Sequence, residues 1–250
     1  MKGLSTEQYR KELELKQALR SLVRFSRIDE YDPYPYQQKF HKTGSEANQR
    51  LLMAANRIGK SFSGAAEMSY HLTGLYPDWW KGRRYDNPIT AWAGGVSNET
   101  TRDIVQYELL GSPDDPDAFG SGAIPKSKII KTERKPGVPN AKSVALIQHV
   151  TGGNSSLHFK AYEMGVDKWQ GRSVDCIWLD EEPSRELYSQ AVTRTLDRKG
   201  MVYMTFTPES GMTETVASFM NNLQPGQSLT NATWDDASEA ISSMKGNKGH

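Results

Sequence analysis

The residues with the clearest chemical potential form the run Ala54-Ala55-Asn56-Arg57-Ile58-Gly59-Lys60-Ser61. The run has the spacing of a Walker A phosphate-binding loop and lies between an apolar segment and a helical pattern. In such a loop, backbone N–H groups and a helix N-terminus surround the phosphates, a lysine adds positive charge and a hydroxyl binds Mg²⁺. Gly59, Lys60 and Ser61 supply these groups, whereas Ala54 stands where the motif usually begins with glycine. The run therefore predicts a site for the β- and γ-phosphates of a nucleotide.

Three acidic residues at the end of an apolar run give the second chemical signal. The run Cys176-Ile177-Trp178-Leu179 is typical of a strand buried on both faces, and Asp180, Glu181 and Glu182 follow it. Ligands bind at this end of the strands in a parallel sheet. We predict that Asp180 holds Mg²⁺ and that Glu181 orients and deprotonates the attacking water, with Glu182 as the alternative base. A second interpretation of Glu182 is an acidic turn that caps the following helix.

Two further motifs are expected beside this site. Thr205-Phe206-Thr207-Pro208 ends the next predicted strand, where the hydroxyls of Thr205 and Thr207 can sense hydrolysis at the phosphate and acidic sites. Upstream, Tyr34-Pro35-Tyr36-Gln37 precedes the phosphate loop. The carboxamide of Gln37 can form two hydrogen bonds with adenine, and an aromatic ring such as that of Tyr36 can stack on the base. An aromatic turn that begins a helix is the alternative interpretation.

The composition excludes several classes of protein. A length of 250 residues suits one large domain or two small ones, and 31 Lys and Arg against 30 Asp and Glu leave a formal charge of +1. This balance excludes a polybasic protein that binds nucleic acid with its whole surface. We expect neither a membrane-spanning segment nor a secretory signal, because no long apolar run occurs. The single cysteine, Cys176, is interpreted as a small buried residue rather than a nucleophile, and it indicates a reducing cytoplasm.

Short apolar runs alternate with helical patterns from Leu51 onward, as in a parallel sheet covered by helices. The fold class is therefore predicted to be α/β. The predicted strands span 50–54, 89–93, 157–161, 176–179 and 201–206, and the predicted helices span 61–75, 98–110, 184–196 and 213–222. Residues 144–150 and 157–161 are expected to form a hairpin around the Gly-rich turn at 151–154.

The chain divides into three expected parts. Residues 1–32 form a helical appendage, in which Ser5 or Thr6 caps an amphipathic helix whose apolar face is Leu15, Leu19, Leu22 and Val23. Residues 33–225 form the phosphate-binding core, and residues 226–250 begin a lid or linker. Within the core, 111–140 is interpreted as a surface insertion. Its basic residues (Lys126, Lys128, Lys131, Arg134 and Lys135) form the best local patch for DNA, with a mobile solvated loop as the safer interpretation.

Together these motifs resemble the ATPase domain of the large terminase subunit, the DNA-packaging motor of tailed double-stranded DNA phages. The resemblance extends over roughly residues 33–236. It rests on the segments Asn56 to Glu67, His71 to Gly74, Trp169 to Gly171, Asp180 to Pro183 and Thr205 to Pro208. The resemblance implies a RecA-like P-loop core with an adenine-reading Gln37, Lys60 and Ser61 on phosphate and Mg²⁺, Asp180 on Mg²⁺, a catalytic Glu181 and a coupling motif from Thr205 to Thr207. Arg57 matches an arginine of the family's phosphate loop, which contacts the γ-phosphate or the next subunit.

The resemblance also implies partners. Motor subunits would form a ring on the portal protein of a procapsid in the bacterial host cytoplasm, and a small terminase subunit would supply double-stranded DNA. A ring ATPase needs a cation from a neighbouring subunit to stabilise the transition state. Lys168, Arg172 and Arg194 are the candidates, with a plain surface charge as the alternative for each.

Large terminase subunits normally continue into a nuclease domain, but no further βαβ pattern follows Asp235-Asp236. We therefore expect translocation chemistry without DNA cutting. The leading hypothesis is ATP hydrolysis coupled to the movement of duplex DNA. The alternatives are a helicase-like ATPase stimulated by nucleic acid and a nucleotide-gated docking module without turnover.

Overall fold

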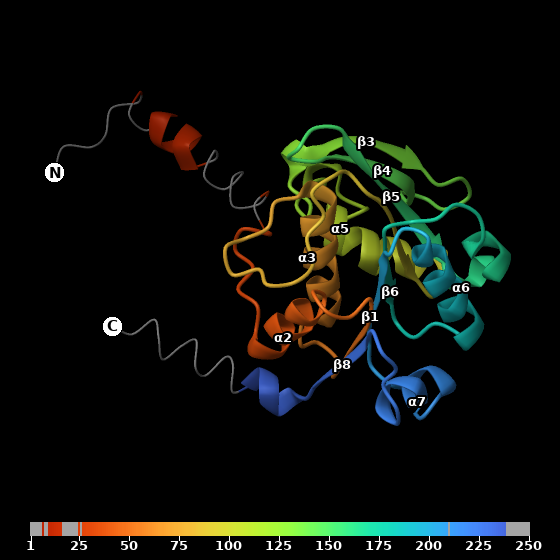
Figure 1. Ribbon diagram of the computed structural model, residues 1–250. Coiled ribbons are helices and arrows are strands. Elements are labelled where there is room, and N and C mark those ends of the chain that lie inside the picture. The colour runs from red at the N-terminus through yellow and green to blue at the C-terminus, as the bar shows by residue number, and fades with distance from the viewer. Residues whose placement is uncertain (1–6, 8–9, 17–24, 26, 210, 239–250) are drawn as a thin grey trace.

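The computed structural model describes residues 7, 10–16, 25, 27–209 and 211–238 (Figure 1). Residues 10–16 are helical, in agreement with the expected N-terminal helix over that stretch. Leu19, Leu22 and Val23, which define most of its predicted apolar face, lie outside the described residues. Among the described residues, none of the helices combines the length and apolar character needed to cross a bilayer.

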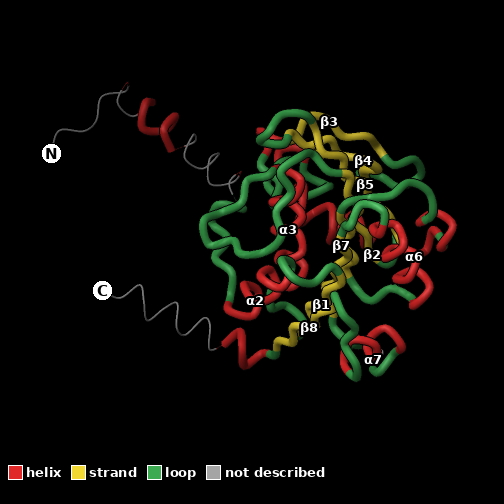
Figure 2. The backbone as a smooth tube through the Cα atoms, viewed as in Figure 1, coloured by secondary structure: helices red, strands yellow, loops and turns green. Residues whose placement is uncertain are grey.

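One eight-stranded sheet forms the centre of the molecule, in the order β3-β4-β5-β2-β6-β7-β1-β8 (Figures 1 and 2). The strands are β1 (Gln49–Ala54), β2 (Thr90–Gly95), β3 (Ile129–Arg134), β4 (Lys142–Gln148), β5 (Asn154–Ala161), β6 (Cys176–Asp180), β7 (Met201–Phe206) and β8 (Gln227–Ala232). Strand β4 is antiparallel to β3 and β5, and every other pair is parallel. The predicted α/β class with a mainly parallel sheet is therefore confirmed.

The five predicted strands and the predicted hairpin are all present, but two strands were not predicted. The segment 111–140, interpreted as a surface insertion, contributes strand β3, which pairs with β4. Strand β8 pairs in parallel with β1, so the sheet continues past residue 225, where the core was expected to end. The buried residues of β3 and β8 are too few to give a clear apolar pattern, which explains why composition alone did not reveal these edge strands.

Helices cover both faces of the sheet. The principal ones are α2 (Pro35–Thr43), α3 (Lys60–Thr73), α6 (Arg185–Leu196) and α7 (Glu214–Met220), three of which match predicted helices closely. The helix predicted at 98–110 is interrupted: α4 (Asn98–Thr100) and α5 (Tyr107–Leu110) flank a π-helical segment, Thr101–Gln106. Figure 1 shows α3 and α6 on opposite sides of the central strands.

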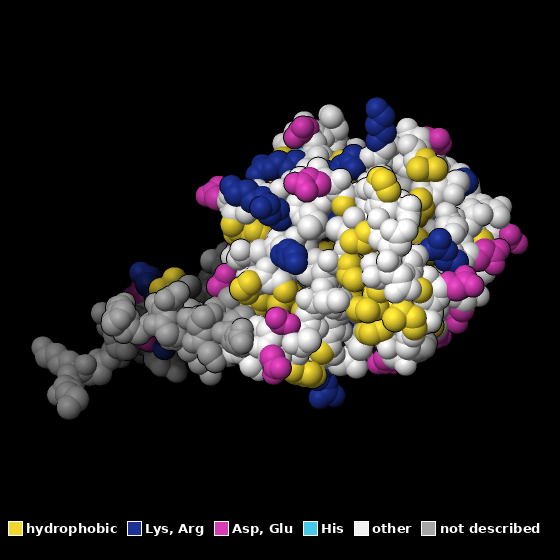
Figure 3. All heavy atoms as spheres, turned by 60° about the horizontal axis from the view of Figure 1, so that its bottom comes forward, with side chains coloured by type: hydrophobic (Ala, Val, Ile, Leu, Met, Phe, Trp, Pro, Cys, Tyr) yellow, Lys and Arg dark blue, Asp and Glu magenta, His cyan; other side chains and the backbone are white. Residues whose placement is uncertain are grey.

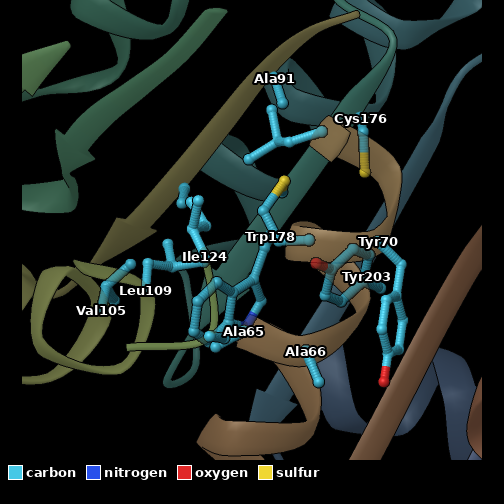
Figure 4. Packing of buried hydrophobic residues seen from close by; sticks show 14 of the residues in the cluster. Ala65, Ala66, Tyr70, Ala91, Val105, Leu109, Ile124, Cys176, Trp178 and Tyr203 are labelled. Atoms are coloured by element: carbon cyan, nitrogen blue, oxygen red, sulfur yellow. The ribbon is translucent and has the colours of Figure 1, made fainter. Parts of the chain in front are cut away.

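Two apolar layers fix these helices to the sheet. Beneath α3, the rings of Trp178 and Tyr203 stack with centroids 6.4 Å apart and lie close to Ala65 (Figure 4). On the other face, Ile177 and Leu179 of the same strand pack in the layer that includes residues of α6 and α7. This alternation is the pleat of a strand buried on both sides, as predicted for β6. Cys176 is fully buried in the first layer, as expected for a small core residue.

Candidate active site

The ends of β1, β6 and β7 bring the predicted motifs together. These strands are parallel and adjacent, and their register pairs Asp180 with Thr205 and Met53 with Phe206. The phosphate loop, the acidic segment and the threonine motif therefore leave the sheet at the same edge. This is the edge at which ligands bind in parallel α/β folds.

The phosphate loop connects β1, which ends at Ala54, with α3, which begins at Lys60. Arg57 and Gly59 have φ angles of 63° and 89°, in the left-handed region. At Gly59 it is the left-handed backbone that favours glycine, because an added Cβ would meet only the mobile amide end of Gln37, at 2.9 Å. Left-handed residues curl the backbone, and the first N–H groups of a helix such as α3 have no acceptor within the helix. The loop thus has the features of an anion-binding site.

Lys60 is buried, and its ammonium group lies between the phosphate loop and the acidic segment. Its Nζ donates to Oδ1 of Asn56 at 3.1 Å and lies 3.7 Å from Oε1 of Glu181. The hydroxyl of Thr207 is 2.8 Å from the same Asn56 oxygen and from the carbonyl oxygen of Ala54. A short chain of contacts therefore joins Lys60 to the threonine motif.

The side-chain oxygens of Asp180 and Ser61 lie next to each other. Oγ of Ser61 donates to Oδ2 of Asp180 at 3.3 Å, and the hydroxyl of Thr205 donates to Oδ1 at 2.7 Å. Burial raises the pKa of Asp180 to about 7, with the Glu181 charge adding to the shift and the two hydroxyls opposing it. Hard oxygen ligands of this kind suit Mg²⁺, which keeps most of its own waters when bound. The residues present fit the ion predicted here.

The carboxylates of Glu181 and Glu182 have different partners. Glu181 has a left-handed φ of 66°, and its carboxylate approaches Lys60. Burial raises the pKa of Glu181, and the charge of Glu209 adds to this, while Lys60 opposes it. In contrast, the carboxylate of Glu182 accepts a hydrogen bond from the hydroxyl of Thr213, the N-cap of α7. The geometry therefore favours Glu181 over Glu182 as the base.

Tyr36 and Gln37 lie in the first turn of α2 and contact the phosphate loop. The hydroxyl of Tyr36 donates to the carbonyl oxygen of Ile58, and Nε2 of Gln37 donates to that of Gly59 at 3.2 Å. Oε1 of Gln37 accepts from the backbone N–H of Tyr34 at 2.8 Å. The structure thus places the predicted adenine-binding pair at the loop, with both side chains bonded to backbone. Their contact with a base stays a prediction.

The four predicted cations differ in exposure and in their contacts. Arg57 is exposed on the phosphate loop. Lys168 and Arg172 are exposed around the segment that precedes β6, whereas the Arg194 guanidinium donates to the carbonyl oxygen of Gly171 at 2.7 Å. Arg194 therefore supports the loop that carries Arg172.

Two features beside the site were not predicted. Oε1 of Glu209 accepts from Nδ2 of Asn56 at 3.2 Å, so a further carboxylate lies at the phosphate loop. Behind the loop, Glu67 of α3 is fully buried and bonds Arg50, His41 and His71. The i, i+4 spacing of Glu67 and His71 was the available sequence signal, because it puts both on one helix face. The proximity of Glu209 depends on tertiary contacts and had no such signal.

Comparisons with known proteins identify the family of the chain. A family model described as the terminase large subunit, T4likevirus-type, N-terminal, matches residues 51–240. The large terminase subunit of Salmonella phage P22 is 35% identical over 260 residues, which cover 97% of this chain and 52% of that protein. The chain thus spans about half the length of this curated relative.

Two solved structures share the fold. The large terminase ATPase domain of Thermus phage P74-26 aligns with a TM-score of 0.51 and 15% identity, over 88% of this chain and 89% of that one. The large terminase of another thermophilic bacteriophage, in complex with ADP, aligns with a TM-score of 0.56 and 11% identity, over 86% of this chain and 49% of that one. The family match over most of the sequence has a direct consequence: this chain belongs to the terminase large subunit family, as its T4-like N-terminal type.

Proposed function

We propose that this chain hydrolyses ATP and that the hydrolysis moves double-stranded DNA into a viral procapsid. The observation that carries the proposal is the convergence of Lys60, Asp180 and Glu181 at one sheet edge, beside a loop shaped for phosphate. Membership of the terminase family supports the coupling of this chemistry to DNA packaging.

Each residue has a separate task in the proposed reaction. Lys60 holds the β- and γ-phosphates, and Glu181 orients the attacking water and accepts its proton. The raised pKa of Glu181 suits a base that works near neutral pH. Ser61 and Asp180 would hold Mg²⁺, which supplies positive charge against the phosphate oxygens. Arg57 is exposed on the same loop, and its proposed task is to contact the γ-phosphate or a neighbouring subunit.

The threonine motif is proposed to detect the state of the phosphate site. Thr205 bonds Asp180, and Thr207 bonds Asn56, the residue that also accepts from Lys60. Loss of the γ-phosphate changes the charges that face Asp180 and Lys60, and these contacts carry that change to the end of β7. Thr205 and Thr207 are therefore the proposed coupling residues.

The nucleotide is proposed to be ATP, read by Gln37 and Tyr36. The second of the two structural relatives was solved in complex with ADP, which supports an adenine nucleotide for that relative. Rotation of Gln37 away from Gly59 would free its carboxamide for the base edge. A measured preference for GTP over ATP would contradict this assignment.

The proposed partners are those of a packaging motor. Copies of the chain would form a ring on the portal protein of the procapsid in the host cytoplasm, and a small terminase subunit would deliver the DNA. Lys168 and Arg172 are proposed as the cations that reach a neighbouring site, with Arg194 as the support of their loop. The proposal assigns no DNA cutting to these residues.

Glu181→Gln provides the decisive test. It removes the base but preserves size and hydrogen bonding, so ATP turnover should fall by about 10² to 10⁴-fold while nucleotide affinity stays within a few-fold. Phosphate release and binding of a fluorescent ATP analogue would be measured with and without duplex DNA, over a range of protein concentrations. Glu182→Gln is the matched control and should retain turnover.

Three outcomes separate the alternatives. Unchanged hydrolysis in a Lys60→Ala variant would contradict the phosphate-loop assignment. A wild-type chain that binds ATP but never hydrolyses it, even with DNA, would favour a nucleotide-gated docking module. Stimulation by single-stranded nucleic acid but not by duplex DNA would favour a helicase-like ATPase.

A further inference from the structure

A tyrosine outside the recognised motifs contacts the turn that carries the catalytic carboxylate. Tyr162 follows β5, and its hydroxyl oxygen lies 2.9 Å from the carbonyl oxygens of both Asp180 and Glu181. The carbonyl oxygen of Gly94 is 3.5 Å away. Carbonyl oxygens only accept hydrogen bonds, so the phenol must be the donor. A phenol has an ordinary pKa of about 10, so it keeps this proton at neutral pH.

The backbone at Glu181 needs such a contact because its conformation is unfavourable. Its φ of 66° is in the left-handed region, which a residue with a Cβ rarely adopts outside sites where the surroundings impose it. Two hydrogen bonds hold the residue from either side. Its N–H donates to the carbonyl oxygen of Thr205 at 3.0 Å, and its carbonyl oxygen accepts from Tyr162. In this conformation the carboxylate lies 3.7 Å from Nζ of Lys60.

The position of Tyr162 is set by core packing that is independent of the phosphate loop. Its ring lies 5.9 Å from that of Trp169, which is fully buried. The indole N–H of Trp169 donates to the carbonyl oxygen of Ala161, the last residue of β5. The phenol is therefore held in part by contacts outside the acidic turn.

We propose that Tyr162 is a positioning residue for the proposed base, because its hydroxyl holds Glu181 in the left-handed conformation that directs the carboxylate toward the phosphate-binding lysine. Tyr162 contacts the backbone of the turn rather than the nucleotide or the attacking water, and it acts through Glu181. The inference rests on the proposed ATPase function, in which Glu181 is the base.

Tyr162→Phe tests the inference, since it removes the hydroxyl and leaves the ring against Trp169. We expect kcat for ATP hydrolysis to fall about tenfold, while KM stays within about twofold, because the phosphate loop itself is unchanged. Tyr85→Phe is the matched control: its hydroxyl donates to the carbonyl oxygen of Asp175 at 2.7 Å, at the opposite end of β6. The control should keep kcat, and both variants should be assayed well below their melting temperatures.

Crystal structures of the wild type and the Tyr162→Phe variant give a readout that needs no activity. A negative φ at Glu181 in the variant, with its carboxylate displaced from Lys60, would support the inference. A left-handed Glu181 in the variant would overturn it. So would an unchanged kcat, a rise in KM alone, or an equal loss of kcat in Tyr85→Phe. A wild-type chain without ATP hydrolysis contradicts the proposed function, whereas the positioning of Glu181 is still decided by the two structures.

Discussion

At the scale of single residues, the most unusual feature is a group of charges buried behind the phosphate loop. Arg50 and Glu67 are fully buried, and the Glu67 carboxylate accepts hydrogen bonds from Arg50, from Nδ1 of His41 at 2.7 Å and from Nε2 of His71 at 3.3 Å. The group joins β1, α2 and α3, the elements that flank the phosphate site. Buried charges are stable only when they are paired and bonded in this way.

The pKa shifts of this group predict instability in acid. Burial lowers the pKa of His71 below its usual value. As the pH falls through about 6.5, the imidazole of the unfolded chain therefore binds a proton before that of the folded protein does. For Glu67, burial acts to raise the pKa, but Arg50 and the two histidines outweigh it and hold the pKa well below its usual value. Here too the unfolded chain binds protons first, below about pH 4.5. Both shifts therefore make stability fall with falling pH. Urea denaturation between about pH 7 and about pH 3 would measure this loss.

Glu67→Gln isolates the contribution of the carboxylate. The variant leaves Arg50 buried without its counter-charge, so we expect a loss of about 3–5 kcal/mol in the free energy of unfolding at pH 7. The exposed Glu99→Gln is the control and should change stability by less than about 0.5 kcal/mol. An equal effect of the two substitutions would show that the buried group does not act as described.

At the scale of elements, α3 lies unusually close to β6. A Cβ added at Gly64 would lie 2.5 Å from the indole of Trp178, and the carbonyl oxygen of Gly64 accepts from the hydroxyl of Tyr203 at 2.9 Å. This glycine lets α3, which begins at Lys60, rest directly on the strand that carries the acidic pair.

Gly64→Ala should therefore destabilise the protein, although alanine favours helices. Overpacking against Trp178 is expected to cost about 1–3 kcal/mol, measured by chemical denaturation. In a double-mutant cycle with Trp178→Phe, the smaller ring should relieve part of this cost. Strictly additive effects would mean that the close approach is not the cause.

The elements also show which parts of the fold and of the site could be predicted from the sequence. The predicted parallel strands and the spacing of Lys60, Asp180 and Thr205 were sufficient to assemble the site, because those strands end at one edge. The break in the helix expected at 98–110 could not be predicted. The π-helical segment that interrupts this helix begins at Thr101, whose hydroxyl is hydrogen-bonded to the carbonyl oxygens of Ser97 and Lys160. The Lys160 contact comes from β5, which is distant in sequence, and a local pattern contains no information about it.

At the scale of the whole molecule, charge is distributed without a dominant sign. Figure 3 shows Lys and Arg side chains interspersed with Asp and Glu over the visible face, as the formal charge of +1 predicts. A ring of such subunits would hold DNA through many weak contacts rather than one strong patch. The proposed function therefore depends on assembly.

Mixing two inactive variants tests whether subunits complete one another's sites. Arg172→Ala keeps its own base but lacks the proposed trans-acting cation, and Glu181→Gln has the opposite defect. If the cation acts between subunits, an equimolar mixture should regain roughly one quarter of wild-type ATP turnover, since random neighbours complete that share of sites. Lys168→Ala replaces Arg172→Ala in a parallel mixture. A mixture no more active than its components, for both cations, would exclude them from this role.

The burial of Cys176 has a practical consequence for such experiments. It is the only cysteine in the sequence, it is fully buried, and burial raises the pKa of its thiol well above the usual value. A thiol in this state reacts with alkylating reagents only when the core opens. New surface cysteines can therefore carry fluorophores for tracking subunit motion without first removing the native one, and the native thiol itself reports the rate of unfolding.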